Sequence, residues 1–176
     1  MASATAFLPR IVALGRGTAQ TQLRGVLQQC NVSKPFVVTD KNLEELTRSV
    51  LDSADVRGEI YADEVDEPTS DRVDAMAAAL SSSGADGVVA IGGGSPLDAA
   101  KLAVVLSENG GKCRDYKAPV LTDTPPTLPM VAVPTTAGTG AEVTRYAVVT
   151  DSKTGEKMLC AGAAFVPAAC VVGGSA

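Results

Sequence analysis

The 176-residue sequence contains no histidine and no tryptophan, and it has only three Phe and three Tyr. Without histidine, the chain cannot form a Ser-His-Asp or Cys-His nucleophile pair, or a metal cage with imidazole ligands. It also lacks an excess of positive charge, because 15 Lys and Arg residues stand against 20 Asp and Glu, for a net charge of −5. Electrostatic capture of nucleic acid needs clustered Lys and Arg. We therefore expect no nucleic-acid partner.

Long apolar runs and paired cysteines are missing too. The most apolar stretch, residues 158–172, is too short to span a bilayer and contains Gly162 and Pro167, so we expect no membrane contact. The four cysteines show no C-x-x-C pair and no zinc-like spacing, which favours reduced thiols over a disulfide pair. Four basic residues precede the first acidic one, Asp40, as in a transit peptide, but residues 11–15 already have a strand pattern. We favour a cytoplasmic location over organelle targeting.

The remaining composition is that of an ordinary globular domain, with 45% apolar and 20% charged residues. Strand patterns at 11–15, 35–39, 59–62, 86–91 and 130–133 alternate with helical patterns at 43–51, 71–82 and 96–108. Two further strands, 146–150 and 157–161, flank a turn-like cluster, and the long connection 109–129 suggests a functional flap. This alternation predicts an α/β fold with a doubly wound, mainly parallel, Rossmann-like sheet and a ligand at the carboxyl ends of its strands.

The strongest local pattern is Ile91-Gly92-Gly93-Gly94-Ser95-Pro96-Leu97-Asp98. Three glycines after a buried strand allow a sharp turn and close backbone approach to a ligand. We expect Ser95 to cap the helix, Pro96 to take its first position and Asp98 its third, so that the N–H groups seat a phosphate. The G-x-G-x-x-G fingerprint fails because Leu97 stands where its last glycine belongs. A tight turn without a ligand remains the alternative.

A second loop, Val133 to Thr144, follows the next predicted strand and should open on the same edge of the sheet. Thr139 and Glu142 have the T-x-x-E spacing of a capping box, and a capped helix start explains those two residues. It does not explain Thr135, Thr136 and two nearby glycines. Hydroxyls and N–H groups in this number are suited to a pyrophosphate or a ribose.

Acidic residues elsewhere have two interpretations. Asp40 closes a predicted strand, where a carboxylate can bind an adenosine ribose and repel a 2′-phosphate, but Asp-Lys-Asn is also an ordinary helix start. The run Asp63, Glu64, Asp66, Glu67 predicts a solvated loop rather than a metal site. Lys101, three residues after Asp98, predicts an ion pair on a helix surface.

Together, the loops Gly92–Lys101 and Pro134–Thr144 resemble, in order and spacing, the iron-containing (group III) alcohol dehydrogenases. The resemblance covers roughly residues 7–172 and has further support from 7–12, 38–40, 67–69 and 150–157. It implies a dinucleotide-binding domain over residues 1–172, followed in the family by an all-helical metal domain that is absent here. Gly173-Gly174 stand where the family has Asp-Pro, so residues 173–176 are predicted to be a short tail outside the family pattern.

The resemblance also implies roles for individual residues. Gly93, Gly94, Ser95 and Asp98 match the family's pyrophosphate loop, and Thr135, Thr136, Thr139 and Thr144 match its second cofactor loop. Asp40 matches the adenosine-ribose position that favours NAD over NADP, and Lys157 matches a lysine at the cofactor's ribose. The family's metal ligands, one Asp and three His, belong to the missing half. We therefore expect no catalytic residue and no metal ligand in this chain.

The leading hypothesis is the cofactor-binding half of an NAD-dependent alcohol dehydrogenase that interconverts primary alcohols and aldehydes. In a full-length form, Fe2+ or Zn2+ would act as a Lewis acid, so we expect the chain alone to be inactive. Two alternatives stay open: a truncated, non-catalytic nucleotide-binding module, and a superfamily relative such as a maleylacetate reductase or glycerol dehydrogenase. Without covering helices, apolar surface in residues 158–172 is expected to be exposed and to cause self-association.

Overall fold

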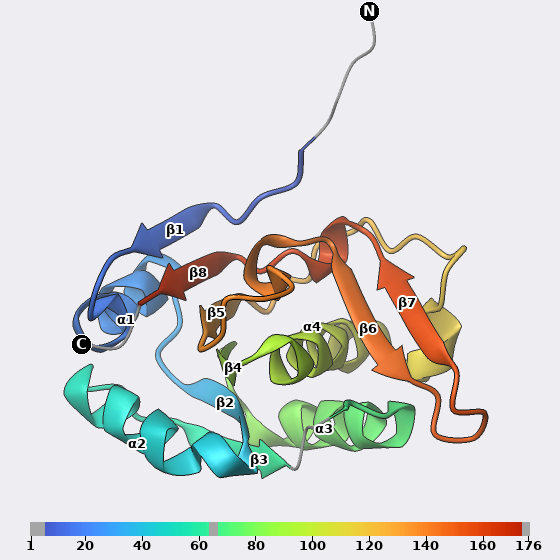
Figure 1. Ribbon diagram of the computed structural model, residues 1–176, viewed down its shortest axis with the longest axis horizontal. Helices are drawn as coiled ribbons and strands as arrows, with labels where there is room; N and C mark the ends of the chain where they lie inside the picture. Colours follow the sequence, from blue (N-terminus) through green and yellow to red (C-terminus); the bar gives the residue numbers. More distant parts are fainter. Residues whose placement is uncertain (1–5, 64–66, 174–176) are drawn as a thin grey trace, which may run out of the picture.

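The computed structural model describes residues 6–63 and 67–173. Strands and helices alternate along the chain (Figure 1). They are β1 (Ile11–Leu14), α1 (Thr18–Gln29), β2 (Pro35–Asp40), α2 (Glu44–Ser53), β3 (Glu59–Asp63), α3 (Ser70–Ser83), β4 (Gly87–Gly92), α4 (Gly94–Asn109), β5 (Met130–Pro134), β6 (Tyr146–Thr150), β7 (Lys157–Ala161) and β8 (Ala169–Val172). Four short 3-10 segments, η1 (Lys41–Leu43), η2 (Cys113–Tyr116), η3 (Ala141–Val143) and η4 (Ala163–Phe165), lie in the connections. Most of the predicted tail and part of the acidic run, Glu64 and Asp66, lie outside the described residues.

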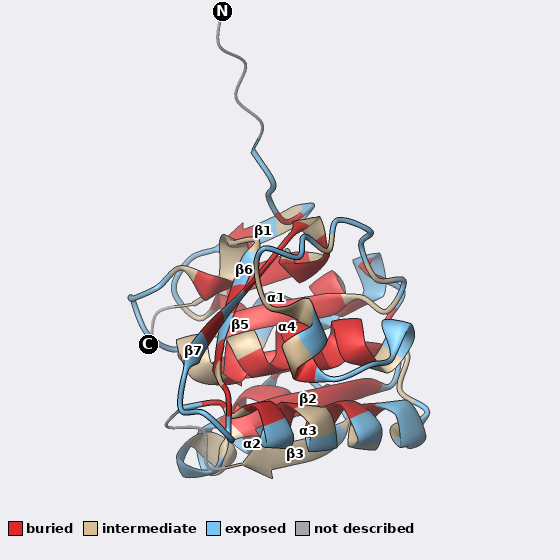
Figure 2. Ribbon diagram, turned by 90° about the vertical axis from the view of Figure 1, so that its right-hand side faces the viewer, coloured by how far each residue is buried: buried red, intermediate tan, exposed pale blue. Residues whose placement is uncertain are grey.

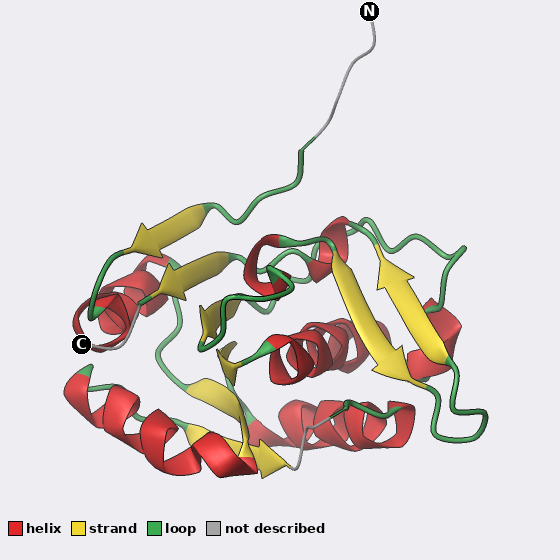
Figure 3. Ribbon diagram, viewed as in Figure 1, coloured by secondary structure: helices red, strands yellow, loops and turns green. Residues whose placement is uncertain are grey.

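Six strands form one parallel sheet in the order β1-β8-β5-β4-β2-β3. Helices cover both faces, as the ribbon coloured by secondary structure shows (Figure 3). The buried residues of α1 and α2 pack on one face of the sheet, and those of α3 and α4 pack on the other. The predicted doubly wound, Rossmann-like α/β fold is therefore confirmed.

The central strand β4 explains how one apolar run serves two cores. Its side chains alternate, so that Val88 and Ala90 pack with α3 and α4, while Val89 and Ile91 pack with α1 and α2. All six residues of β4 are buried. Most residues of its neighbours β2 and β5 are buried as well, as the red colour of these two strands shows (Figure 2). Strands of parallel sheets covered on both faces have this continuous apolar composition. The same burial fixes the position at which β4 ends and the glycine loop begins.

Strands β6 and β7 form a separate antiparallel hairpin that packs on α4. Its inner face consists of Ala147, Val149, Met158 and Cys160, all fully buried. The expected exposure of residues 158–172 is therefore wrong for most of that stretch, in which Leu159 is the one large apolar residue that is exposed. Helix α4 covers the hairpin, and β8 lies inside the main sheet between β1 and β5.

Helix α1 lies where the sequence patterns predict no element. It is rich in Gln and Thr, and its buried face rests on Ala19, Leu23, Val26 and Leu27. Within the described residues, no helix has the length and apolarity needed to cross a membrane. All four cysteines are buried and free, in agreement with the prediction of unpaired thiols.

Candidate cofactor site

Three candidate segments begin side by side at the carboxyl edge of the sheet. Strand β4 pairs with β2 on one side and β5 on the other, with Thr39 opposite Ile91 and Gly92 opposite Pro134. From there, β2 continues into α2 on one face of the sheet, and β4 continues into α4 on the opposite face. In open α/β sheets, the carboxyl ends of strands that diverge in this way are where ligands bind.

The first glycine loop is tighter than expected. Helix α4 starts at Gly94 with Gly93 as its cap, so the predictions that Ser95 caps the helix and that Asp98 takes its third position are wrong. The reason is that the chain enters the helix directly after β4. A Cβ added to Gly92, which has φ 154°, would lie 2.4 Å from Cγ of Pro96. Gly93 has no side chain to close the helix end, which is the arrangement in which first-turn N–H groups receive a phosphate.

The second loop packs directly on the first. The N–H of Thr135 donates to the carbonyl oxygen of Gly92 at 2.9 Å. A Cβ on Gly94 would lie 2.8 Å from Oγ1 of Thr139, and one on Gly93 would lie 3.4 Å from Oγ1 of Thr136. The three threonine side chains are exposed at this edge. The two loops therefore form one continuous surface of glycine backbone and threonine hydroxyls.

The expected capping box in the second loop is not formed. The segment that follows Thr139 is the three-residue 3-10 turn η3, and its cap is Gly140 with φ 68° rather than the threonine. Because no α-helix begins there, Thr139 has no helix N-terminus to cap. Its hydroxyl lies over Gly94 instead.

Asp40 lies at the end of β2, one residue after Thr39, which pairs with Ile91 of β4. Its Oδ1 accepts a hydrogen bond from the N–H of Asn42 at 2.7 Å and so caps η1, which confirms the ordinary helix-start interpretation. Just before it, the buried Thr39 hydroxyl bonds Oγ1 of Thr47 at 2.8 Å and the carbonyl oxygen of Ile91 at 3.0 Å. These bonds fix β2 against β4 one residue before the glycine loop. Ribose binding by Asp40 stays a prediction.

Lys101 forms the predicted ion pair with Asp98, but the predicted position on the helix surface is wrong, because Lys101 is 2% exposed. Its Nζ lies 3.5 Å from Oδ1 of Asp98, 3.2 Å from both oxygens of Thr144 and 2.8 Å from the carbonyl oxygen of Tyr146. Burial lowers the pKa of Lys101 and raises that of Asp98, because both charges have left water.

A signal for this burial was present in the sequence. Helix α4 is apolar on every side around Lys101, and helices of that kind are buried. A lysine inside such a helix must find oxygen partners. Two of the predicted cofactor residues, Asp98 and Thr144, are those partners.

Strand β6 runs antiparallel to α4, because Lys101 contacts Thr144 and Tyr146 while Asp98, one turn earlier, accepts from the N–H of Val148 at 3.0 Å. The far end of β6, Thr150, pairs with Lys157 and therefore lies toward the N-terminal end of α4. The structure thus places Lys157 on the same side as the glycine loop.

Lys157 is engaged by an acidic partner at this position. Its Nζ lies 3.1 Å from Oε1 of Glu67, and the same oxygen accepts from the hydroxyl of Thr150 at 2.6 Å. The hydrogen bond from Thr150, followed by the contact with Lys157, lowers the pKa of Glu67. Both members of the ion pair are largely exposed, so the pair leaves Lys157 accessible to a ligand anion.

A family model described as iron-containing alcohol dehydrogenase matches residues 9–173. The chain belongs to the iron-containing alcohol dehydrogenase family. It is 35% identical to a probable alcohol dehydrogenase, EutG, of Escherichia coli over 91% of its length, and 32% identical to the NAD-dependent methanol dehydrogenase of Bacillus methanolicus over 94%. The crystal structure of sulfoacetaldehyde reductase from Bifidobacterium kashiwanohense in complex with NAD+ superposes with a TM-score of 0.87, at 28% identity over 98% of the chain.

This member of the family spans less than half of those relatives. It covers 41% of the E. coli protein, 44% of the B. methanolicus protein and 46% of the Bifidobacterium chain. The iron named in the family description is not matched by side chains here, because residues 6–63 and 67–173 contain no group of three His, Cys, Asp or Glu arranged to hold a metal.

Proposed function

We propose that this chain is the dinucleotide-binding part of an oxidoreductase that uses NAD to interconvert primary alcohols and aldehydes. The proposal rests on the contact between the two loops at the carboxyl ends of β4 and β5. There, Gly94 lets Thr139 approach so closely that a Cβ at position 94 would lie 2.8 Å from Oγ1 of Thr139. Two relatives support the choice of cofactor: one is named as NAD-dependent, and the other was solved with NAD+.

In this proposal the pyrophosphate lies over the N-terminus of α4. Backbone N–H groups of Gly93, Gly94 and Ser95 face it from below, and the hydroxyls of Thr136 and Thr139 face it from the second loop. The helix dipole and the N–H groups in the first turn of a helix favour an anion at this position. Thr135 holds the second loop to the first through its backbone. Lys157 lies on the same side and supplies a positive charge near the cofactor's ribose.

Asp40 sets the preference between the two cofactors. A carboxylate at the end of β2 accepts hydrogen bonds from the adenosine ribose of NAD and repels the 2′-phosphate of NADP. Its capping bond to Asn42 occupies Oδ1 and orients the carboxyl group. Capping and ribose binding are therefore compatible.

We propose that hydride transfer needs metal ligands and an alcohol pocket in addition to the residues described above. When bound, NAD accepts or donates the hydride, and the chain's own residues bind and orient it. Metal ligands and most of the alcohol pocket are assigned to the part of the relatives that this chain does not cover. We therefore expect dinucleotide binding without alcohol turnover from these 176 residues.

Calorimetric titration with NAD and NADP tests the proposal. We expect NAD to bind more tightly than NADP, and Gly94→Val to abolish binding of both while the fold persists by circular dichroism. Absence of saturable binding of either dinucleotide would overturn the proposal.

Asp40→Asn separates the two roles of Asp40. Asparagine caps a helix start about as well as aspartate but carries no charge. It should therefore narrow the preference for NAD by about tenfold, which corresponds to roughly 1.4 kcal/mol. Asp52→Asn, at an exposed position in α2, is the matched control. Tighter binding of NADP by the unmodified chain would show that the role given to Asp40 is wrong.

A further inference from the structure

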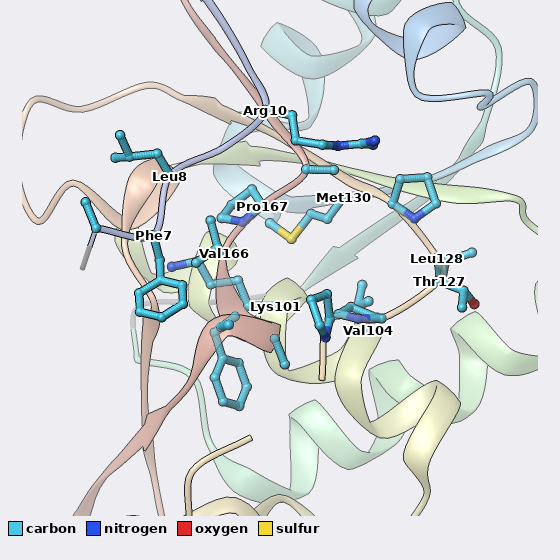
Figure 4. A pocket seen from close by; sticks show the side chains of 18 residues that line it. Phe7, Leu8, Arg10, Lys101, Val104, Thr127, Leu128, Met130, Val166 and Pro167 are labelled. Atoms are coloured by element: carbon cyan, nitrogen blue, oxygen red, sulfur yellow. The ribbon is translucent and has the colours of Figure 1, made fainter. Parts of the chain in front are cut away.

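We propose that a cavity at the amino ends of the strands, opposite the cofactor loops, binds a small carboxylic acid with a hydrocarbon chain. The cavity has a volume of about 600 Å3. It lies between three segments, residues 6–10, 125–130 and 163–168, and Lys101 and Val104 of α4 form its floor (Figure 4). Ligand pockets in proteins typically measure about 300 to 1,000 Å3, so the volume suits a small molecule.

The cavity is separate from the cofactor site. Arg10 directly precedes β1, Met130 begins β5, and Ala168 directly precedes β8. These are the amino ends of parallel strands, whereas Gly92 and Pro134 are carboxyl ends. A five-residue strand is about 17 Å long, so the two ligands would not overlap.

The walls of the cavity are held in place by hydrogen bonds. The N–H of Arg10 donates to the carbonyl oxygen of Ala168 at 3.0 Å, and the N–H of Ala168 donates to that of Met130 at 2.9 Å. The carboxylate of Glu108, at the end of α4, accepts from the N–H and hydroxyl of Thr127 at 2.8 and 2.7 Å, and from the N–H of Leu128 at 2.5 Å. The cavity is therefore preformed, which lowers the entropic cost of binding.

Charge selects the ligand class. The chain carries a net charge of −5, yet among the described residues that line the cavity only two have ionisable side chains, the cations Arg10 and Lys101. The ammonium group of Lys101 already faces the oxygens of Asp98, Thr144 and Tyr146. The Arg10 side chain is exposed and extends along one rim of the cavity (Figure 4). Arg10 is thus the cation that meets a ligand.

The geometry of the lining favours a carboxylate over a phosphate. A guanidinium group presents two parallel N–H donors that match the two oxygens of one carboxylate. Few other donors are available, because four lining residues are prolines without an N–H: Pro125, Pro126, Pro129 and Pro167. The rest of the wall is apolar and includes Phe7, Leu8, Met130 and Val166. These surfaces suit a hydrocarbon body attached to a single acid group.

Titration of the chain with octanoate tests the inference, with octanamide as the neutral probe of the same shape. We expect saturable octanoate binding and a loss of at least about tenfold in Arg10→Gln, since a hydrogen bond to a charged group contributes that much. The affinity for octanamide should not change in this variant. The control is Arg57→Gln, at an exposed position far from Arg10 in the sequence, which should bind octanoate with the affinity of the unmodified chain.

Four results would overturn the inference. These are no saturable octanoate binding, equal affinity for octanoate and octanamide, an unchanged octanoate affinity in Arg10→Gln, and competition between octanoate and NAD. Analytical ultracentrifugation of the same samples tests whether a second copy of this chain occupies the cavity instead. A dimer that Arg10→Gln dissociates and octanoate leaves intact would assign the cavity to that copy instead. If the chain binds octanoate but not NAD, the proposed cofactor site is wrong and the carboxylate site stands.

Discussion

Replacing Lys101 by methionine removes one buried charge while keeping the length of the side chain. The Lys101 side chain is 1% exposed and that of Asp98 is 14% exposed, so the carboxylate of Asp98 would remain in the interior without its cation. Removing one partner of a buried ion pair costs about 3 to 5 kcal/mol in the free energy of unfolding. We expect the lower end of that range, about 3 kcal/mol, because Asp98 retains its bond from the N–H of Val148.

Urea unfolding measures this loss. With a slope of roughly 2 kcal/mol per molar urea, a loss of about 3 kcal/mol lowers the midpoint by about 1.5 M. Lys153→Met, at an exposed position in the turn between β6 and β7, is the matched control and should leave the midpoint unchanged.

The loss should depend on pH with a definite sign. Burial raises the pKa of Asp98 in the folded chain, and loss of the Lys101 charge raises it further. A carboxyl group with a raised pKa destabilises the folded state when it is ionised, and this cost disappears as the pH falls through the folded pKa toward the unfolded value near 3.9. The deficit of Lys101→Met should therefore be larger at pH 8 than at pH 5.

The double variant Lys101→Met/Asp98→Asn tests the cause. Asparagine keeps an acceptor for the N–H of Val148 but has no charge to desolvate, so the double variant should regain more than half of the lost stability. A loss below about 1 kcal/mol at pH 8 would refute the reasoning, since it would lie well under the range for buried pairs. So would a deficit that is the same at both pH values.

Two further outcomes follow from the packing of the chain. Gly94→Ala places a Cβ 2.8 Å from Oγ1 of Thr139 and should weaken NAD binding by about tenfold, or roughly 1.4 kcal/mol. The fold should persist, because Thr139 is exposed and can move. An unchanged affinity for NAD in calorimetry would contradict the proposal that the two loops bind the cofactor together. Burial raises the pKa of Cys113 to about 12 and that of Cys160 to about 11, and all four thiols are buried. At pH 8, a disulfide reagent should therefore label less than one thiol in the native chain and all four in urea, and stoichiometric native labelling would contradict this burial.

Local patterns were enough to predict the elements around the glycine loop. The run from Gly87 to Ile91 is continuously apolar and the helix that follows has its own periodicity, so both can be located without their neighbours. Helix α1 was not predicted because few of its residues are apolar. Its buried face is recognised only from its packing against β8 and β1. The capping interpretations of Ser95 and Thr139 were wrong because glycine took the cap position in both loops.

The fold class, the family and the edge of the sheet at which the cofactor loops open can be predicted from the amino-acid sequence alone. These depend on residues that are adjacent in the chain, such as Gly92, Gly93 and Gly94, and on the rule that parallel strands end at one edge. The surroundings of Lys101 become known only from the three-dimensional fold, because its partners Thr144 and Tyr146 lie more than forty residues away in the chain. The same holds for the cavity beside Arg10, which exists only where three distant segments meet. Burial and charge pairing depend on neighbours in space, and local sequence does not specify those neighbours.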